Sequence, residues 1–435
     1  MSTTKLHASR TFLLRAFMLP AFVFALMFTS RGSSAADYTV TDCTDAMSSN
    51  TLRGVVSFVV SQGVDNKSVD VSGCETITLT QGEIRIPISM TISGAGQGTT
   101  IDANLASRVF SSFDGLMNGF NKTLTLANLG IVHGRHFTAN SLPASGGCID
   151  VYAVILQDSV VSDCAATTML GQVYGGAINA GYVTLTDSRV ENGLGSSGTQ
   201  DVYGGAIRAS FDFTCTRSSV SGSHAGTGGG SYGYGGGLYA AFNATLTGCT
   251  IDSNSADIGA GIYSAGNLDL TDSTVSGNSA TTAGTGGIEG DSITITYSTI
   301  SNNLGYCGGV AGGTIAMNST IIAKNHSYFN DCDDLSAGGP VTGANNFVGV
   351  VYENTVVPEG TISGDPILTP LADHGGPTPT HALSVNSPAI DHGGTALLTT
   401  DQRGAGFARV VGAAADIGAY ERQAGDEQLL YAGFE

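Results

Sequence analysis

The stretch Tyr-Gly-Gly-Ala-Ile stands at residues 174–178 and again at residues 203–207, 29 positions later. It belongs to a series in which a glycine pair or near-pair precedes an apolar residue, an alternating stretch and a Val or Ile. The units start at residues 146, 175, 204, 235, 259, 286 and 308, at spacings of 29, 29, 31, 24, 27 and 22 residues. A period of about 20 to 50 residues is typical of solenoids, propellers and repeat arrays.

The pattern inside each unit selects among these architectures. Residues 183–190 (VTLTDSRV) and 268–275 (LDLTDSTV) begin with apolar and polar residues in alternation, which indicates strands. No unit carries a helical pattern, and a propeller blade needs about 40 residues. The units therefore predict an all-β fold, a right-handed parallel β-helix, with one coil per unit and about ten coils between residues 76 and 330.

Stacking of coils explains why the same residues recur, because each strand pairs with its equivalent one coil on, at about 4.8 Å. We expect Ile178 beside Ile207 and Ile207 beside Leu238, with Val190 beside Val220. The glycine pair permits a tight corner in every coil. An internal asparagine ladder is expected from the residues that follow the units, namely Asn192, Asn254, Asn278, Asn303 and Asn325.

The first 36 residues have the features of a signal peptide. Lys5, Arg10 and Arg15 precede an apolar run over residues 16–28, and small residues before Asp37 favour cleavage after Ala36. An uncleaved N-terminal anchor is the alternative. Past this segment no run of 18 apolar residues follows, so no transmembrane segment is expected after cleavage.

The charge balance restricts the partners. Removing residues 1–36 leaves 13 basic and 36 acidic residues, a net charge of −23. Such a surface repels nucleic acid and anionic membranes. The eight cysteines are an even number, compatible with disulfides in an exported chain, but their pairing cannot be read from spacing alone. None has the C-x-x-C spacing of a zinc or redox site.

Both ends resemble known bacterial segments. Residues 43–56 (CTDAMSSNTLRGVV) and 76–103, which begin with TITLT, resemble the CSLREA region found before bacterial β-helices. DPILTPLADHGGPTPTHAL from residue 365, DQRG at 401–404 and DIGAYE at 416–421 closely resemble the choice-of-anchor Q domain of exported bacterial β-helix proteins. That family implies export and a right-handed parallel β-helix, and its molecular activity is generally unassigned.

The resemblance and the repeats together divide the chain into five segments. These are a signal peptide (1–36), an N-terminal cap (37–75), the β-helix (76–345), an irregular choice-of-anchor Q-like domain (346–421) and a tail (422–435). A short helix over residues 51–60, with Asn50 as its N-cap, is expected in the cap. Cys43 and Cys74 both lie in the cap and are expected to form a disulfide.

The strongest candidates for catalysis lie in one acidic loop. Asp331, Asp333 and Asp334 follow His326 closely, and β-helices that cleave polysaccharides use carboxylates as acid, base or calcium ligands. A solvated acidic loop held by Cys332 explains the same residues. No motif for calcium or another cofactor accompanies them, and no metal site is expected. Arg189, Arg208 and Arg217, in neighbouring coils, are candidates for a projecting base or ordinary surface residues.

Two further groups have both a structural and a functional interpretation. The C-terminal set is expected to be mainly structural, with Arg403 paired to Asp401 or Asp416 and His381 in the core; its members are Asp373, His374, His381, Asp391, Asp401, Arg403, Asp416 and Glu421. Tyrosines near the glycine corners could bind sugars or pack the corners; they are Tyr174, Tyr203, Tyr232, Tyr234 and Tyr239.

The sequence therefore supports two hypotheses. The first is a monomeric, exported, non-enzymatic protein, secreted or associated with the outer membrane, that binds an extracellular polysaccharide or a host or cell-surface protein in the manner of an adhesin. The second is a polysaccharide lyase or glycoside hydrolase on the same fold, since fold alone does not determine function. Carboxylates from adjacent coils meeting in a groove would favour the enzyme.

Overall fold

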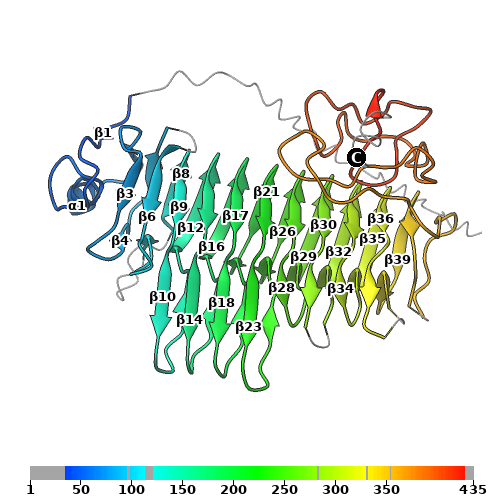
Figure 1. Cartoon of the computed structure of the whole chain (residues 1–435), viewed down its shortest axis with the longest axis horizontal. Coiled ribbons are helices and arrows are strands. Elements are labelled where there is room, and N and C mark those ends of the chain that lie inside the picture. The colour runs from blue at the N-terminus through cyan, green and yellow to red at the C-terminus, as the bar shows by residue number, and fades with distance from the viewer. Residues whose placement is uncertain are drawn as a thin grey trace, which may run out of the picture. The chain divides into compact units, whose positions relative to one another are not determined.

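The computed structural model describes residues 35–95, 98–112, 121–281, 284–329, 332–352 and 354–426. Contacts divide the chain into residues 1–35 and a compact unit of residues 36–435, which holds the helix and strands of the described residues. The signal-peptide prediction falls almost wholly outside the described residues. Within them, strands of successive coils pair in parallel and stack into four sheets (Figure 1). The parallel β-helix is confirmed, while its right-handed sense stays a prediction.

Two of the sheets, A and B, contain most of the strands. Sheet A contains β1 (Tyr38–Thr39), β2 (Lys67–Asp70), β4 (Ile84–Arg85), β5 (Met90–Ser93), β7 (Phe110–Ser111), β8 (Thr123–Ala127), β12 (Ile149–Gln157), β16 (Ile178–Thr186), β20 (Ile207–Ala209), β21 (Phe213–Thr216), β25 (Leu238–Ala240), β26 (Ala244–Thr247), β29 (Ile262–Thr271), β32 (Ile288–Thr296), β35 (Val310–Asn318), β38 (Leu335–Ala337) and β39 (Val341–Ala344). Sheet B contains β3 (Thr76–Thr78), β6 (Thr100–Asp102), β9 (Gly130–Val132), β13 (Val160–Ser162), β17 (Arg189–Glu191), β22 (Ser219–Ser221), β27 (Thr250–Asp252), β30 (Thr274–Ser276), β33 (Thr299–Ser301), β36 (Ile321–Ile322) and β40 (Phe347–Val348).

Two smaller sheets complete the coils. Sheet C contains β10 (Arg135–Thr138), β14 (Ala165–Thr168), β18 (Leu194–Ser197), β23 (His224–Thr227), β28 (Ser255–Ala256), β31 (Ser279–Ala280), β34 (Leu304–Gly305) and β37 (His326–Ser327). Sheet D contains β11 (Ala144–Ser145), β15 (Val173–Tyr174), β19 (Val202–Tyr203) and β24 (Gly233–Tyr234).

The register follows the sequence repeat. Ile178 pairs with Ile207, Ile207 pairs with Leu238, and Val190 pairs with Val220. These side chains belong to one buried apolar cluster that continues through the coils. The predicted alignment of equivalent positions is therefore confirmed.

The N-terminal end is covered by helix α1 (Leu52–Gln62), which lies at the blue end of the coils (Figure 1). Its apolar side chains, including Leu52 and Val56, enter the same core cluster. The predicted N-cap was wrong by one residue: Thr51, rather than Asn50, accepts the N–H of Gly54 with its side chain. The helix ends at Gly63, which adopts the left-handed conformation (φ 62°) that favours glycine.

The asparagine ladder forms with one correction. Asn254, Asn278, Asn303 and Asn325 are buried, and each side-chain oxygen from Asn278 on accepts the backbone N–H of the preceding member, at 3.0 Å. Asn192 is not a member, because it lies one position early, at a turn with φ 55°, and donates to Asp163. Its neighbour Gly193 donates to Ser223, which in turn bonds Asn254.

The cysteines are all paired. Cys43 and Cys74 form the disulfide expected in the cap. Three others join Cys148 to Cys164, Cys215 to Cys249 and Cys307 to Cys332. Among the described residues no helix has the length and apolar character needed to cross a membrane.

Residues after Asp365 form an irregular segment that packs on sheet B. Gln402 donates to the Thr250 hydroxyl and accepts from that of Thr274. The N–H of Ala419 bonds the hydroxyl of Thr299 at 3.0 Å. This segment, orange to red in Figure 1, therefore covers strands β27 to β33 through polar contacts with their side chains.

Candidate ligand-binding groove

The repeated glycine pair brings two columns of outward side chains together at one corner of the coils. In each copy the Val of the strand in sheet D is buried and the following Tyr is half-buried on the outside. The first glycine has a positive φ, 65° at Gly175 and 85° at Gly204. At Gly176 a Cβ would lie 2.0 Å from the Gly205 carbonyl oxygen, so only glycine fits this corner.

The first column consists of tyrosines from sheet D. Tyr174, Tyr203 and Tyr234 stack on one another, with ring centroids 5.8 Å and 5.5 Å apart. The residue aligned with them in the preceding coil is Ser145. Because the rings stack face to face, this column presents ring edges and hydroxyl groups to solvent.

The second column starts sheet A, one residue after each Ala-Ile or its equivalent. Its members, in register through the coils, are Asp150, Asn179, Arg208, Tyr239, Tyr263 and Glu289. The rings of Tyr239 and Tyr263 stack with centroids 5.5 Å apart. The residue types change along this column although the backbone repeats.

The two columns touch in a regular stagger, each tyrosine of the first meeting a member of the second one coil on. Tyr203 meets Tyr239 edge to face at 5.1 Å, and Tyr234 meets Tyr263 at 5.2 Å. The guanidinium of Arg208 lies 4.5 Å from the ring centroid of Tyr174. We call the strip of surface formed by both columns, from Ser145 and Asp150 to Glu289, the corner groove.

Hollows follow one another along the corner groove. One of about 440 Å³ lies beside Gln172 and Tyr174, and these two residues also line the next, of about 190 Å³, with Arg208. A third, of about 250 Å³, lies at Tyr263 and Glu289. An extended ligand lying parallel to the coil axis would therefore meet several of them.

The groove carries protonated phenols at neutral pH. Burial, with the nearby Asp201 carboxylate, raises the pKa of Tyr203 to about 12. Burial also raises the pKa of Tyr234, Tyr239 and Tyr263. The hydroxyls of Tyr174 and Tyr203 donate to Gln172 and Asp201, whereas those of Tyr234, Tyr239 and Tyr263 remain protonated and can donate to a ligand.

Arg208 is the cation in the middle of the groove. One Nη donates to Asn179 at 3.0 Å and to Ser210 at 2.6 Å. Its buried Nε has no hydrogen-bond partner. Burial lowers the pKa of Arg208, but an arginine remains charged in a protein. The guanidinium lines the hollow of about 190 Å³, where its charge faces a bound ligand.

A cluster of charged residues from neighbouring coils closes the N-terminal end of the groove. Arg108 forms ion pairs with Glu83 at 2.9 Å and with Asp150 at 3.2 Å. Although burial opposes ionisation, Arg108 holds the pKa of Glu83 below its usual value. Burial and Arg108 lower the pKa of His136, which accepts from Arg108 at 2.7 Å. No sequence motif pointed to this cluster, because Glu83 and Arg108 precede the clear repeats.

The acidic loop is a structural element rather than an open site. Asp334 is 2 % exposed and ends the asparagine ladder, its Oδ1 accepting from the backbone and side chain of Asn325. Its Oδ2 accepts from the N–H of Val350 at 2.7 Å. Asp333 accepts from the N–H of Ser327, and His326 lies exposed on β37. Asp331 lies outside the described residues.

The three candidate arginines lie at different places in the coils. Arg189 pairs with Glu191 on sheet B, and Arg217 pairs with Asp187, both at a distance from the corner in the coil. Only Arg208 joins the groove. Of the predicted tyrosines, Tyr232 lies exposed beside Tyr234, at 6.2 Å, and the other four are column members.

The C-terminal candidates form buried contacts within the irregular segment. Arg403 pairs with Asp401, one of the two expected partners, and lies over the rings of Phe407 and Tyr420. His381 is buried, with its ring nitrogens bonded to Thr369 and Ser276.

The remaining carboxylates of this set bind backbone amides. Asp416 accepts from Asp391 and Arg422, and Glu421 accepts from Asp416 and Val411. Asp391 accepts from Ala413, Asp373 from Gly375, and His374 contacts Thr380. These residues hold loops in place.

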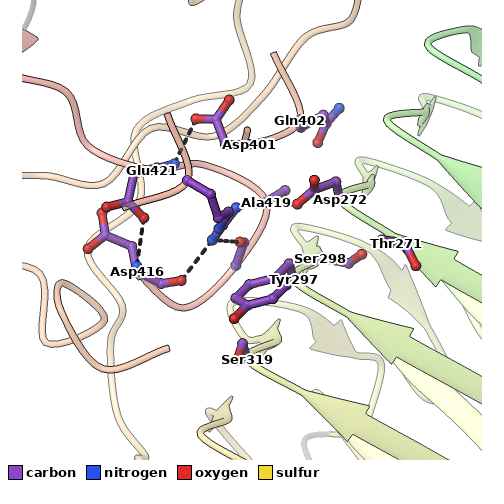
Figure 2. A network of polar contacts seen from close by, with 12 residues as sticks. Thr271, Asp272, Tyr297, Ser298, Ser319, Asp401, Gln402, Asp416, Ala419 and Glu421 are labelled. Carbon is purple, nitrogen blue, oxygen red and sulfur yellow. Dashed lines mark hydrogen bonds and ion pairs between the residues drawn. The ribbon is translucent and has the colours of Figure 1, made fainter. Parts of the chain in front are cut away.

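Figure 2 shows where this segment, with Asp416 and Ala419, meets Asp272 and Tyr297 of the coils. Arg409 donates to Asp272 at 3.3 Å and to the carbonyls of Asp416 and Gly418, and lies over the ring of Tyr297. Burial raises the pKa of Asp272 to about 7 although Arg409 opposes the rise. In the described part of the chain no group of three or more His, Cys, Asp or Glu side chains could hold a metal ion.

Comparison with known proteins adds little. No protein-family model and no curated protein matches the chain. Among solved structures it is similar to the "Crystal structure of pectate lyase Pel9A", with 12% identity and a TM-score of 0.41, over 89% of this chain and 97% of that chain.

Proposed function

We propose that this chain is an exported, non-enzymatic protein that binds an extracellular polysaccharide lengthwise in the corner groove. The observation that carries the proposal is the continuity of the second column across successive coils, from Asp150 to Glu289, with the first column beside it from Ser145 to Tyr234. Equivalent positions recur at about 4.8 Å. A linear polymer lying along the axis would thus meet a hydroxyl, amide, guanidinium or carboxylate group in every coil of the groove.

The chemistry of the groove supports a polyhydroxy ligand. Around the central hollow, the Tyr239 hydroxyl and the Arg208 guanidinium are donors, and the Gln172 amide both donates and accepts. Half-buried aromatic residues combine an apolar body with a polar tip, as sugars do. The acidic composition disfavours nucleic acid as the polymer.

Export forms part of the proposal. The four disulfides are typical of oxidising compartments outside the cytosol. The N-terminal segment and the resemblance to choice-of-anchor Q proteins agree with this. A surface or adhesive role, in which the groove holds the chain to a glycan-coated surface, would follow from the same binding site.

A second candidate function is cleavage of the polysaccharide. The cluster of Glu83, Arg108, His136 and Asp150 favours it, because these groups come from different coils and meet at the end of the groove. However, Asp150 already accepts from Ser145 at 2.7 Å and from Asn179 at 2.8 Å, besides its ion pair. Carboxylates satisfied in this way hold the groove together, which supports binding without cleavage.

The test is retention on immobilised polysaccharides, together with a turnover assay. We expect wild-type protein to be retained and to release no new reducing ends or unsaturated products. Arg208→Ala should weaken retention about tenfold, equivalent to about 1.4 kcal/mol. Arg189→Ala is the matched control, since Arg189 lies on sheet B. Product formation that Asp150→Asn abolishes would establish the enzyme instead. Equal retention of the two arginine variants would rule out the corner groove as the binding site.

A further inference from the structure

The aromatic part of the second column ends at Tyr263. Its ring stacks on Tyr239 at an interplanar angle of 2°, so one face is covered. The residue in register in the next coil is Glu289, and the one after that is Ala311. Glu289 accepts the backbone N–H of Thr285 at 3.1 Å, which turns its carboxylate toward the corner. Among the described residues no ring lies on the other face of Tyr263.

The surface next to this ring is bare backbone. Gly290 on β32 and Gly312 and Gly313 on β35 line the hollow of about 250 Å³ together with Tyr263, Glu289 and Asp291. A Cβ on Gly313 would lie 2.6 Å from the Asp291 carbonyl oxygen, and one on Gly312 would lie 2.9 Å from Ile293. The tight stacking of these coils therefore keeps side chains out of the floor.

The acidic groups at the hollow have no cation beside them. Every ion pair between described residues involves other acids. Arg208, the cation of the groove, precedes Glu289 by three coils in the column. The hollow thus combines an aromatic platform, a flat floor and two carboxylates that accept hydrogen bonds.

We propose that this hollow, lined by Tyr263, Glu289, Gly290, Asp291, Gly312 and Gly313, binds one uncharged hexose unit of the polysaccharide. The inference rests on the proposed function and names its ligand class. The apolar face of the pyranose packs on Tyr263, and its hydroxyls donate to Glu289 and Asp291. Carboxylates without cations repel a carboxylate on the sugar, so the pocket selects neutral units over uronates.

The experiment measures affinity by calorimetry for neutral polysaccharides (soluble glucan, mannan and galactan) and for polygalacturonate. Wild-type protein should bind one neutral polymer at least tenfold more tightly than polygalacturonate. Tyr263→Ala should lose at least tenfold of that affinity, while Tyr263→Phe should stay within threefold because it keeps the ring. Tyr306→Ala, on a tyrosine outside the groove, is the control. The double variant Glu289→Gln, Asp291→Asn should reduce the ratio of the affinity for the neutral polymer to the affinity for polygalacturonate.

The outcomes separate the two proposals. If wild-type protein binds and Arg208→Ala weakens binding but Tyr263→Ala does not, the corner groove is supported as the binding site. The proposal of a hexose site at Tyr263 is then wrong. Tighter binding of polygalacturonate by wild type would also overturn the pocket. No binding of any polysaccharide would overturn both. A Tyr263→Ala variant that unfolds is replaced by the charge variant, whose loss of discrimination tests the pocket independently.

Discussion

At the scale of single residues, the acidic loop that was a candidate for catalysis has a structural role, because its buried Asp334 bonds to neighbouring polar groups. Asp334 takes the place of the next asparagine and ends the ladder. It is buried, and desolvation raises its pKa. A carboxylate in that position holds two coils together, so its removal reports on folding rather than on catalysis.

We predict that Asp334→Ala destabilises the protein by about 3 kcal/mol or more, because two buried donors on Asn325 and the half-buried N–H of Val350 lose their acceptor. Asp333→Ala, which removes one acceptor of the Ser327 N–H, should cost about 1 kcal/mol. Urea unfolding followed by circular dichroism measures both. Equal midpoints for the two variants would contradict the role of Asp334.

A second prediction concerns pH. Asp272 and Glu421 have a pKa of about 7, raised by burial from 3.8 and 4.5, so the folded state holds protons that the unfolded state releases. Their contribution to the free energy of unfolding is therefore present at low pH and falls as pH rises from about 4 through 7. Asp272→Asn, which resembles the neutral acid, should lose less thermal stability between pH 5 and pH 8 than wild type does. A parallel decline in both proteins would contradict this.

At the scale of elements, the corner is the repeated device. The glycine pair, the inward Val and the outward Tyr recur at β15 and β19 because the strands of sheets D and A join there in the same tight turn. The repeat predicted the register of Ile178, Ile207 and Leu238, since identical or similar residues stack on themselves.

The same repeat could not predict the second column. Asn179, Arg208 and Tyr239 are chemically unlike, although they occupy equivalent positions, so sequence similarity did not connect them. The cluster around Arg108 and the end of the ladder at Asp334 lie where the repeat is irregular, and loops there decide which residues meet. The tyrosines could be predicted as a cluster, but their face-to-face stacking, which leaves edges for a ligand, required the structure.

We predict that Gly176→Ala destabilises the protein by several kcal/mol, on the order of 3, because its Cβ would overlap the Gly205 carbonyl and force neighbouring coils apart. Gly98→Ala is the matched control, as no atom lies within 4 Å of its added Cβ. Thermal unfolding of both variants measures the effect. A normal melting temperature for Gly176→Ala would show that the corner can relax.

At the scale of the whole molecule, the coils are covered at their N-terminal end, packed against an irregular segment along sheet B and linked by disulfides. Helix α1 covers the first coils, and the irregular C-terminal segment contacts sheet B over several coils. Cys215 and Cys249 are 34 residues apart, whereas Cys148 and Cys164 are 16 apart. The longer loop restricts the unfolded chain more.

Replacing Cys215 and Cys249 together by Ala should therefore lower the free energy of unfolding by about 4 kcal/mol, and replacing Cys148 and Cys164 by about 3 kcal/mol, from loop entropy. Equilibrium unfolding without reductant compares the two double variants with wild type. If neither variant differs from wild type, the disulfides contribute nothing to the stability of the coils.

The identical copies at residues 174–178 and 203–207 also have a consequence for how such a gene can evolve. A duplication of the DNA that encodes one complete coil would insert a new coil whose edges match both neighbours, so the reading frame and the core would survive together. Each such event would lengthen the groove by one tyrosine without altering the residues already there. The length of polymer that the protein grips would thus be inherited in whole steps, set by copy number rather than by gradual substitution.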